Sequence, residues 1–277
     1  MARCFVGVSG WRYSSWRGDF YPTGLRQKDE LTFIASKINS VEINGSFYSL
    51  QRPTSYQRWA TETPDGFLFA VKGGRYITHL KQLRGVEQPL ANFFASGVLA
   101  LGGKLGPVLW QLPPRLRFTP DVVDEFLSLL PRTHAEAAAL AAGHDDKLVT
   151  DRVLTTICAG VDPQLPIRHA LEPRHTSFDS PEARSMLQRH RVATVIADSA
   201  GTWPTMTDAT ADFRYVRLHG ESELYASGYS ADSLDRWAGQ CHAWLTEGHD
   251  VFVYFDNDAR GHAPHDAVAL AGRLGPR

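Results

Sequence analysis

Eight short runs of apolar, β-branched and aromatic residues recur along the chain. They cover residues 4–10, 40–44, 67–73, 107–113, 169–175, 192–199, 213–220 and 250–257. Most of these runs are continuously hydrophobic rather than alternating, which is the pattern of strands that other elements cover on both faces. We therefore predict eight buried strands.

Helix signals lie between several of these runs. Thr119 and Ser180 each precede a proline and then an acidic residue, the order that is common at helix N-termini. Apolar residues spaced from Leu234 to Leu245 predict a helix with one buried face that ends at Gly248. A last amphipathic pattern covers residues 262–275. Alternation of strands and helices predicts a parallel sheet.

The fold class that follows is α/β, and we predict a (β/α)8 TIM barrel that forms a single domain over residues 1–277. An open, doubly wound sheet is the alternative, but no strand is followed by a glycine-rich dinucleotide-binding turn. Residues 131–168 form an insertion between the fourth helix and the fifth strand, and their alanine-rich part predicts an added helix. The insertion is either a surface elaboration or a lid or oligomer contact. The remaining length is close to the roughly 250 residues typical of such barrels.

Composition narrows the range of partners. The chain has 277 residues, is 43% hydrophobic and carries a formal net charge of −1, so nothing attracts it globally to nucleic acid or to an anionic membrane. Three cysteines (Cys4, Cys158 and Cys241) without a CxxC spacing predict reduced thiols rather than disulfides. With neither a signal peptide nor a membrane-spanning segment in the sequence, we expect a cytoplasmic protein.

Polar residues gather at the C-terminal ends of the predicted strands. Three strands carry a polar pair at positions i and i+2, namely Glu42 and Asn44, Glu172 and Arg174, and Arg217 and His219. Such pairs share one face of a strand, and in a parallel barrel all of these ends meet at the rim where active sites are built. Other polar residues in the same position are Lys72, Gln111, Asp198, Asp256 and Asn257. The alternative is an internal ion-pair network that only fills the barrel.

Two loops add aromatic and basic residues near this rim. The loop at residues 10–22 mixes Trp11 and other aromatics with arginines, and the loop at residues 71–79 holds Lys72, Arg75 and His79 around two glycines. Basic and aromatic side chains beside a cleft suit an anionic ligand that carries a ring. Simple packing of Trp16 and Phe20 against the barrel is the alternative.

The sequence indicates the type of reaction less clearly than it indicates the fold. Two carboxylates such as Glu42 and Glu172 could divide acid and base roles between them. Glu42, Glu172, Asp198, His219 and Asp256 could also bind a divalent metal ion, but no HxH or HExxH motif supports this, so we do not predict a metal site. Ser9 lacks the GxSxG elbow of a serine nucleophile.

These motifs together resemble the YecE-like family, a group of TIM-barrel proteins known as domain of unknown function 72. The matching segments are "GVSGWRYSSW…FYP", "VEINGSFY", "RWATETP", "FLFAVKGGRYITH", "LWQLPP", "LEPRH", "YVRLHG" and "YFDNDARGHA". The resemblance implies a barrel with a polar cleft and no settled reaction, cofactor or partner. Pro173 and Asp256 depart from the residues that the family usually has at those positions. The resemblance implies cleft positions for Glu42, Asn44, Lys72, His79, Gln111, Glu172, Arg174, Arg217, His219 and Asn257.

Our leading hypothesis is an enzyme, such as a hydrolase or an isomerase-like lyase, that acts on a phosphorylated sugar or nucleotide-like anion. Its predicted catalytic residues are Glu42, Glu172 and His219. Its predicted substrate-binding residues are Trp11, Asn44, Lys72, His79, Gln111, Arg174, Arg217 and Asn257. The alternatives are a nucleic-acid-binding or metal-dependent nuclease-like protein and a non-catalytic module that binds a metabolite or partner. The cofactor and the oligomeric state stay open.

Overall fold

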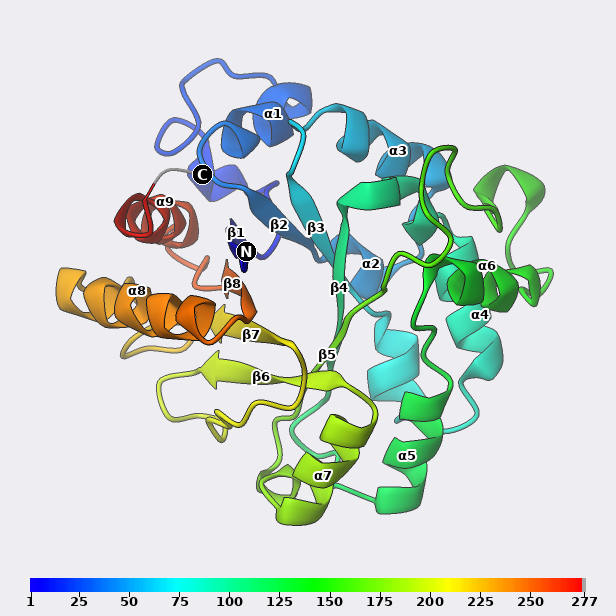
Figure 1. The fold of residues 1–277 in the computed structure, drawn as a ribbon. Coiled ribbons are helices and arrows are strands. Elements are labelled where there is room, and N and C mark those ends of the chain that lie inside the picture. Colours follow the sequence, from blue (N-terminus) through cyan, green and yellow to red (C-terminus); the bar gives the residue numbers. More distant parts are fainter. Residues whose placement is uncertain (276–277) are drawn as a thin grey trace.

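The structure is a computed structural model that describes residues 1–275, and eight parallel strands form its centre (Figure 1). All eight predicted strands are present; seven are shorter than the apolar run that indicated them, and β4 is as long as its run but begins two residues earlier. The strands are β1 (Cys4–Val8), β2 (Ser40–Ile43), β3 (Leu68–Lys72), β4 (Leu105–Gln111), β5 (His169–Glu172), β6 (Val192–Asp198), β7 (Phe213–Leu218) and β8 (Asp250–Phe255).

The sheet runs in the order β1-β8-β7-β6-β5-β4-β3-β2, and its two end strands meet to close a barrel. Near the top of this seam the Gly10 N–H donates to the Glu42 carbonyl at 2.8 Å. Near the bottom the Asn39 side chain accepts from the Val6 N–H and donates to the Cys4 carbonyl, at 2.8 and 2.9 Å. The Asn39 amide thus replaces ladder hydrogen bonds between the two strands. The TIM-barrel prediction is confirmed, and the open-sheet alternative is wrong.

Helices surround the strands in Figure 1, and their starts follow the sequence signals. Ser180 and Ser230 cap their helices by accepting from backbone N–H groups, whereas Thr119 occupies the cap position without such a bond. Residues 199–212 between β6 and β7 are not helical, so the strand–helix alternation is incomplete there. The helices are α1 (Glu30–Ala35), α2 (Gly45–Tyr48), α3 (Pro53–Thr61), α4 (Glu87–Ala95), α5 (Pro120–Ser128), α6 (His134–Ala142), α7 (Pro181–Arg189), α8 (Ala231–Thr246) and α9 (Ala263–Arg273).

The insertion at residues 131–168 contains α6, which lies against α4 on the outside of the barrel (Figure 1). An antiparallel bridge between Thr133 and Pro166 brings the two ends of the insertion together. The Leu154 N–H donates to the Ala95 carbonyl at 2.8 Å, which fastens the return segment to the end of α4.

The barrel has two hydrophobic cores, one between the strands and the helices and a smaller one inside the ring of strands. Large aromatic side chains fill the inner core, and the Tyr254 hydroxyl of β8 lies 2.7 Å from the Ser40 hydroxyl of β2, across the intervening strand β1. Gly7 leaves room for this crossing, because a Cβ there would come within 2.9 Å of the Tyr254 ring. The inner core consists of Phe5, Ala70, Leu109, Ala170, Ala193, Val195, Phe213, Tyr215, Phe252 and Tyr254. Above it, toward the C-terminal ends of the strands, the interior becomes polar.

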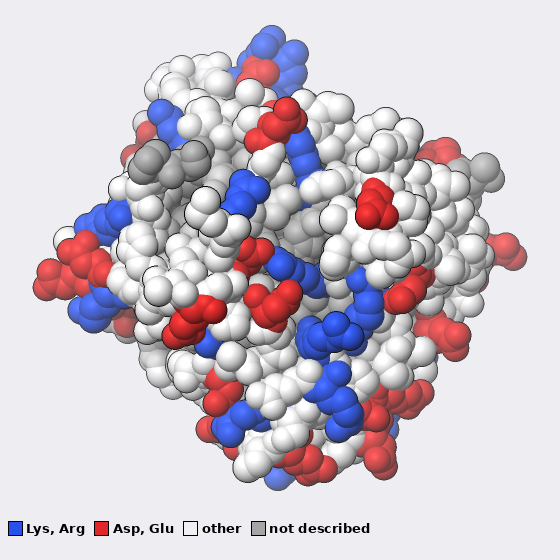
Figure 2. All heavy atoms as spheres, in the orientation of Figure 1, with Lys and Arg blue, Asp and Glu red and all other residues white. Residues whose placement is uncertain are grey.

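On the face drawn in Figure 2, acidic and basic side chains are intermixed. A cavity of about 480 Å³ opens among Arg3, Asn39 and Phe67, at the end of the barrel where the strands begin. Within residues 1–275, none of the helices combines the length and the apolar character that crossing a membrane requires.

Candidate functional site

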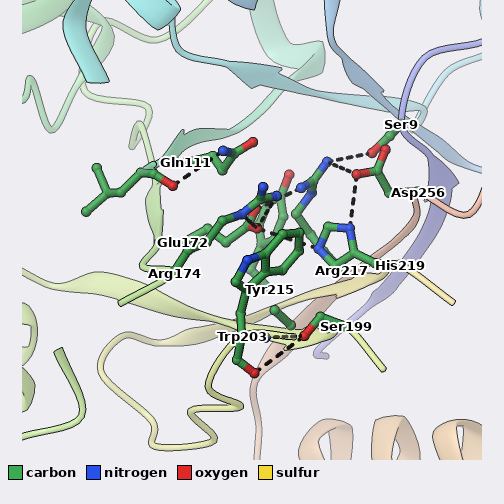
Figure 3. A network of polar contacts seen from close by, with 12 residues as sticks. Ser9, Gln111, Glu172, Arg174, Ser199, Trp203, Tyr215, Arg217, His219 and Asp256 are labelled. Carbon is green, nitrogen blue, oxygen red and sulfur yellow. Dashed lines mark hydrogen bonds and ion pairs between the residues drawn. The ribbon is translucent and has the colours of Figure 1, made fainter. Parts of the chain in front are cut away.

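Arg217 is the centre of a buried polar cluster at the C-terminal ends of the strands (Figure 3). Its side chain is fully buried, and each of its three nitrogens contacts a carboxylate. Nε and Nη2 bond to the two oxygens of Glu42 at 3.1 and 2.9 Å, and Nη1 bonds to Glu172 at 2.8 Å. Nη2 also bonds to Asp256 at 3.0 Å. Strands β2, β5, β7 and the end of β8 therefore meet at this guanidinium.

Glu42 is fully occupied by donors. Besides Arg217, the Ser9 hydroxyl donates to one of its oxygens at 2.8 Å, and the Tyr215 hydroxyl donates to the other at 2.7 Å. The carboxylate is completely buried. Four donor contacts from three side chains therefore occupy the two oxygens of this carboxylate. Glu42 thus lies inside the buried cluster, in a position that suits orienting Arg217.

Glu172 joins Arg217 to Arg174. Arg174 Nε donates to Glu172 Oε1 at 2.8 Å, and its Nη2 lies at the same distance but is not aligned for a hydrogen bond. Burial would favour the neutral acid, yet Arg174 and Arg217 hold the pKa of Glu172 well below its ordinary value. Nε2 of His219 approaches the same oxygen at 3.5 Å.

His219 and Asp256 form a pair beside Arg217. The His219 Nδ1 lies 3.1 Å from Asp256 Oδ2, and its Nε2 has no hydrogen-bond partner within residues 1–275. Burial opposes ionisation of Asp256, but Arg217 and His219 hold its pKa well below the usual range. The Asp256 side chain keeps 16% of its surface exposed, whereas Glu42 and Glu172 keep none. Asp256 is therefore the carboxylate of this cluster that a ligand can reach.

Two aromatic residues from loops cover the cluster. The Trp203 ring lies 3.6 Å from the Arg174 guanidinium carbon, a stacking contact visible in Figure 3. The rings of Trp203 and Tyr225 contact His219 edge-on at 5.2 and 5.4 Å. The Ser199 hydroxyl accepts from the Trp203 N–H at 3.0 Å and so fixes the start of the loop.

Lys72 lies at the end of β3 with its side chain turned toward the same cluster. The residue is 8% exposed, and no carboxylate of residues 1–275 comes within 4.0 Å of its ammonium nitrogen. That nitrogen lies 4.6 Å from the centre of the Phe47 ring. Burial, with a smaller effect of Arg217, lowers the pKa of Lys72 to about 8. Lys72 is a buried cation without a close counter-ion.

His79 and Gln111 lie near Lys72 at the C-terminal end of the barrel. The Gln111 Nε2 is 3.5 Å from the His79 Nε2, and the Thr78 hydroxyl is 2.9 Å from the other ring nitrogen. Burial, together with a smaller effect of the nearby cations Lys72, Arg174, Arg115 and Arg75, lowers the pKa of His79 to about 4. At neutral pH the imidazole is therefore uncharged and surrounded by positive charge.

Three predicted site residues lie away from Arg217. Trp11 packs edge-on against Trp59 with ring centres 5.3 Å apart, and together with Asn44 it lines a separate cavity of about 290 Å³ at the same end of the barrel. Asn257 donates to the Ser227 carbonyl and to Asp266, at 2.9 and 2.8 Å, and so ties the last strand to α9.

Asp198, which was considered as a metal ligand, is also outside the cluster. Its strand neighbour is Leu218, whereas Arg217 pairs with Ala197, so Asp198 points to the opposite side of the sheet. Within residues 1–275 no three His, Cys, Asp or Glu side chains are grouped as a metal site requires.

The aromatic loop at residues 10–22 is packed rather than open. Trp16 and Tyr21 are buried, the Trp16 ring donates to Asp258, and the Tyr21 hydroxyl donates to the Trp11 carbonyl at 2.7 Å. Burial raises the pKa of Asp258 to about 7. Trp16 thus follows the packing alternative and does not offer its ring to a ligand.

Several members of the site were not singled out from the sequence. Ser9 and Tyr215 could have been, because Ser9 directly follows a strand and Tyr215 lies two residues before Arg217 on the same face. Trp203, Tyr225 and Phe47 come from irregular segments or a single helical turn, where no repeating pattern indicates the direction of a side chain.

A closed ring of eight parallel strands with polar side chains at their C-terminal ends defines a TIM-barrel protein. The chain belongs to the family described as "Protein of unknown function DUF72", whose model matches residues 5–277. The YecE-like resemblance is thereby confirmed.

Two curated relatives are UPF0759 proteins. YunF of Bacillus subtilis (strain 168) is 24% identical over 94% of this chain and 90% of its own length. YecE of Escherichia coli (strain K12) is 28% identical over 39% of this chain and 37% of its own length.

Solved structures show the same fold. A DUF72 family protein of Thermotoga maritima aligns with a TM-score of 0.75 and 23% identity, over 98% of this chain and 99% of the other. A DUF72 family protein of Enterococcus faecalis aligns with a TM-score of 0.73 and 17% identity, over 100% of this chain and 96% of the other.

Proposed function

We propose that this protein is an enzyme that performs acid/base chemistry on a small anionic ligand at the C-terminal mouth of the barrel. One observation carries the proposal: the three carboxylates of the cluster all contact Arg217, while the ammonium of Lys72 has no carboxylate within 4.0 Å. A buried cation without a counter-ion is costly unless a ligand supplies the charge.

The anion would bind between Lys72 and Arg174. Arg174 is held in place by Glu172 on one side and by the Trp203 ring on its face, so its guanidinium is already oriented. The low pKa of His79, caused by burial and by the cations near it, is a second sign of positive potential at this point. Phosphate and carboxylate groups are the anions that such a site recognises. Arg217, by contrast, is occupied by its carboxylates and supports the site from below.

Proton transfer would fall to His219, and Asp256 would orient its imidazole. Asp256 is the partly exposed carboxylate, and His219 holds it through Nδ1 while Nε2 has no hydrogen-bond partner within residues 1–275. An imidazole fixed through one nitrogen can exchange a proton through the other. Glu172 would position His219 and Arg174, and Glu42 would position Arg217. This assignment moves Glu42 and Glu172 from the base role to a positioning role.

The test is binding followed by turnover. Calorimetry with inorganic phosphate, sugar phosphates and nucleotides should find at least one ligand, and Arg174→Gln should weaken its binding about ten-fold. Arg26→Gln, an exposed arginine paired with Asp29, is the control and should bind normally. For a ligand that is converted, His219→Gln should lower kcat more than it changes KM. Absence of binding to every anion in the panel would contradict the proposal.

A second candidate function is binding of single-stranded nucleic acid, and one observation favours it. Tyr48 and Tyr76, on the segments after β2 and β3, are 70% and 48% exposed, and Arg75 adjoins Tyr76. Exposed aromatic rings beside cations are suited to stacking with unpaired bases. Fluorescence anisotropy with a labelled single strand should then show binding that weakens with salt and is lost in Tyr48→Ala. Binding that is unchanged in Tyr48→Ala, or absent, would dismiss this candidate.

A further inference from the structure

We propose that Lys72 is a nucleophile that forms an imine with the carbonyl group of an anionic aldehyde or ketone. This inference rests on the proposed function, since the anion site would hold the charged end of the same ligand. It names the substrate class as small carbonyl compounds that bear a phosphate or carboxylate.

The position of Lys72 suits this chemistry. It is the last residue of β3, and the Ser46 hydroxyl donates to its backbone carbonyl at 2.6 Å, which fixes the root of the side chain. Its amine is neither paired with a carboxylate nor hydrogen-bonded within residues 1–275, yet the residue keeps 8% of its surface exposed. The backbone of Lys72 is thus fixed at the C-terminal end of β3, and its side-chain nitrogen is free to attack.

The surroundings of Lys72 also favour the neutral amine, which is the reactive form. Burial against Phe47 removes water from the ammonium, and the positive charge of Arg217 opposes a second positive charge nearby. Desolvation and a neighbouring cation are the two means by which proteins activate a lysine nucleophile. With a pKa of about 8, roughly a tenth of the amine is neutral at pH 7, a few hundred times more than for an ordinary lysine.

The reaction balances with no further reactant except a proton from solvent. The neutral Lys72 nitrogen forms a bond to the carbonyl carbon as the carbon–oxygen π bond breaks, and one amine hydrogen passes to the oxygen as a proton. The hydroxyl then takes a second proton from solvent, the carbon–oxygen bond breaks and water leaves, so the nitrogen keeps one hydrogen and the product is the protonated imine. Nothing is oxidised or reduced. The protonated imine carries a positive charge, which Asp256, Glu42 and Glu172 favour from beyond ion-pair distance.

If the site only bound anions, Lys72 would contribute a positive charge and would not form an imine. One variant separates these two roles. Lys72→Arg keeps a positive charge at the same place, but a guanidinium does not form an imine under these conditions. Imine formation should therefore be lost in Lys72→Arg even though the positive charge remains.

The experiment is reductive trapping. The intact protein is incubated with glyceraldehyde 3-phosphate and sodium borohydride, and the modified lysine is located by peptide mass spectrometry; glyceraldehyde is the uncharged comparison. We expect the phosphorylated aldehyde to label Lys72 at least about ten times faster than the exposed Lys28, with a rate that rises through a midpoint near pH 8. Uncharged glyceraldehyde should label Lys72 more slowly.

The outcomes distinguish this inference from the proposed function. Labelling of Lys28 and Lys37 with Lys72 unmodified would overturn the inference, and inorganic phosphate that still binds to the same protein would leave the anion site intact. Labelling of Lys72 that is equally fast with both aldehydes would support the nucleophile and contradict the anion site. In Lys72→Arg the specific adduct should disappear, and an adduct that still formed at the wild-type rate would also overturn the inference.

Discussion

At the scale of single residues, the buried amine of Lys72 should lower the stability of the folded chain. Burial lowers its pKa to about 8, whereas in the unfolded chain it stays near the ordinary 10.5. Between these values the unfolded state binds more protons, so the free energy of unfolding rises with pH there. Below pH 8 the amine is charged in both states, so the full cost of burying the ammonium applies.

Lys72→Met should therefore be more stable than the wild type by about 3 kcal/mol at pH 7, and the difference should shrink as the pH approaches 10.5. Urea unfolding at pH 7 and pH 10 measures it. Lys28→Met, at an exposed position, should show no difference at either pH. A less stable Lys72→Met would mean that the amine has a stabilising partner.

The Asp258 carboxyl should ionise near neutral pH in the folded chain, because burial raises its pKa to about 7. The Trp16 indole donates a hydrogen bond to it. The folded state keeps a proton on Asp258 that the unfolded state has already released above about pH 4, so its contribution to stability is lost as the pH rises toward 7. Ionisation next to the indole should change tryptophan fluorescence with a midpoint near pH 7. Asp258→Asn should remove this transition; a transition that persists in the variant would belong to another group.

At the scale of elements, the turn after β3 depends on a glycine. A Cβ on Gly73 would lie 2.2 Å from the ring of Trp110, which is fully buried and donates to His169 at 3.2 Å. Gly73→Ala should thus destabilise the fold by about 1–3 kcal/mol, the usual cost of overpacking. Gly103→Ala is the matched control, because a Cβ there meets no atom within 4 Å. Equal unfolding midpoints in urea for the two variants would show that the turn can shift without cost.

The β6–β7 loop should matter for binding rather than for folding. Trp203 stacks on Arg174 and is fixed through Ser199. Trp203→Leu should leave the guanidinium less well oriented and weaken anion binding by about two- to thirty-fold, since such contacts are worth about 0.5–2 kcal/mol. Trp237→Leu, on α8, is the control and should bind phosphate like the wild type in calorimetry. Unchanged phosphate binding in Trp203→Leu would show that Glu172 alone orients Arg174.

Sequence patterns predicted the direction of side chains within the strands but not beyond the strand ends. The continuous apolar runs identified all eight strands, and the two-residue repeat placed Arg217 and His219 on one side, where both contact Asp256. The same rule gave no guidance at Asn44, because β2 ends at Ile43 and Asn44 is already the cap of α2. Where the strand geometry ends, the alternation of side chains ends with it.

Connecting segments that have no repeating hydrophobic pattern were harder to predict from the sequence. Residues 199–212 contain Gly201 and Pro204 and form a loop where strand–helix alternation predicted a helix. The direction of Trp203 depends on the contact of its backbone with Ser199, which no local pattern encodes. The burial of the loop at residues 10–22 likewise depends on Asp258, more than 200 positions away along the chain.

At the scale of the whole molecule, closing the barrel brings Ser9, Glu42, Glu172 and Arg217 from four strands into contact. A buried cluster of this kind adds little net stability, because removing charges from water offsets their attraction. Its members are nevertheless interdependent. Removing one cation leaves several buried anions without compensation.

Arg217→Met should therefore destabilise the protein by about 3–5 kcal/mol at pH 7, as loss of one partner of a buried ion pair does. In the wild type, Arg217 helps to hold the pKa values of Glu172 and Asp256 low, so their contribution to stability is present at neutral pH and is lost as the pH falls through those values. In the variant these carboxyls should become protonated within the folded state at a higher pH. The deficit relative to the wild type should then be smaller at pH 4.5 than at pH 7, which urea unfolding at both values would measure. Adding Glu42→Gln to Arg217→Met should restore part of the lost stability at pH 7, because it removes one uncompensated charge. A deficit that is the same at both pH values, with no rescue by the second substitution, would show that Arg217 stabilises the barrel by packing and not by charge.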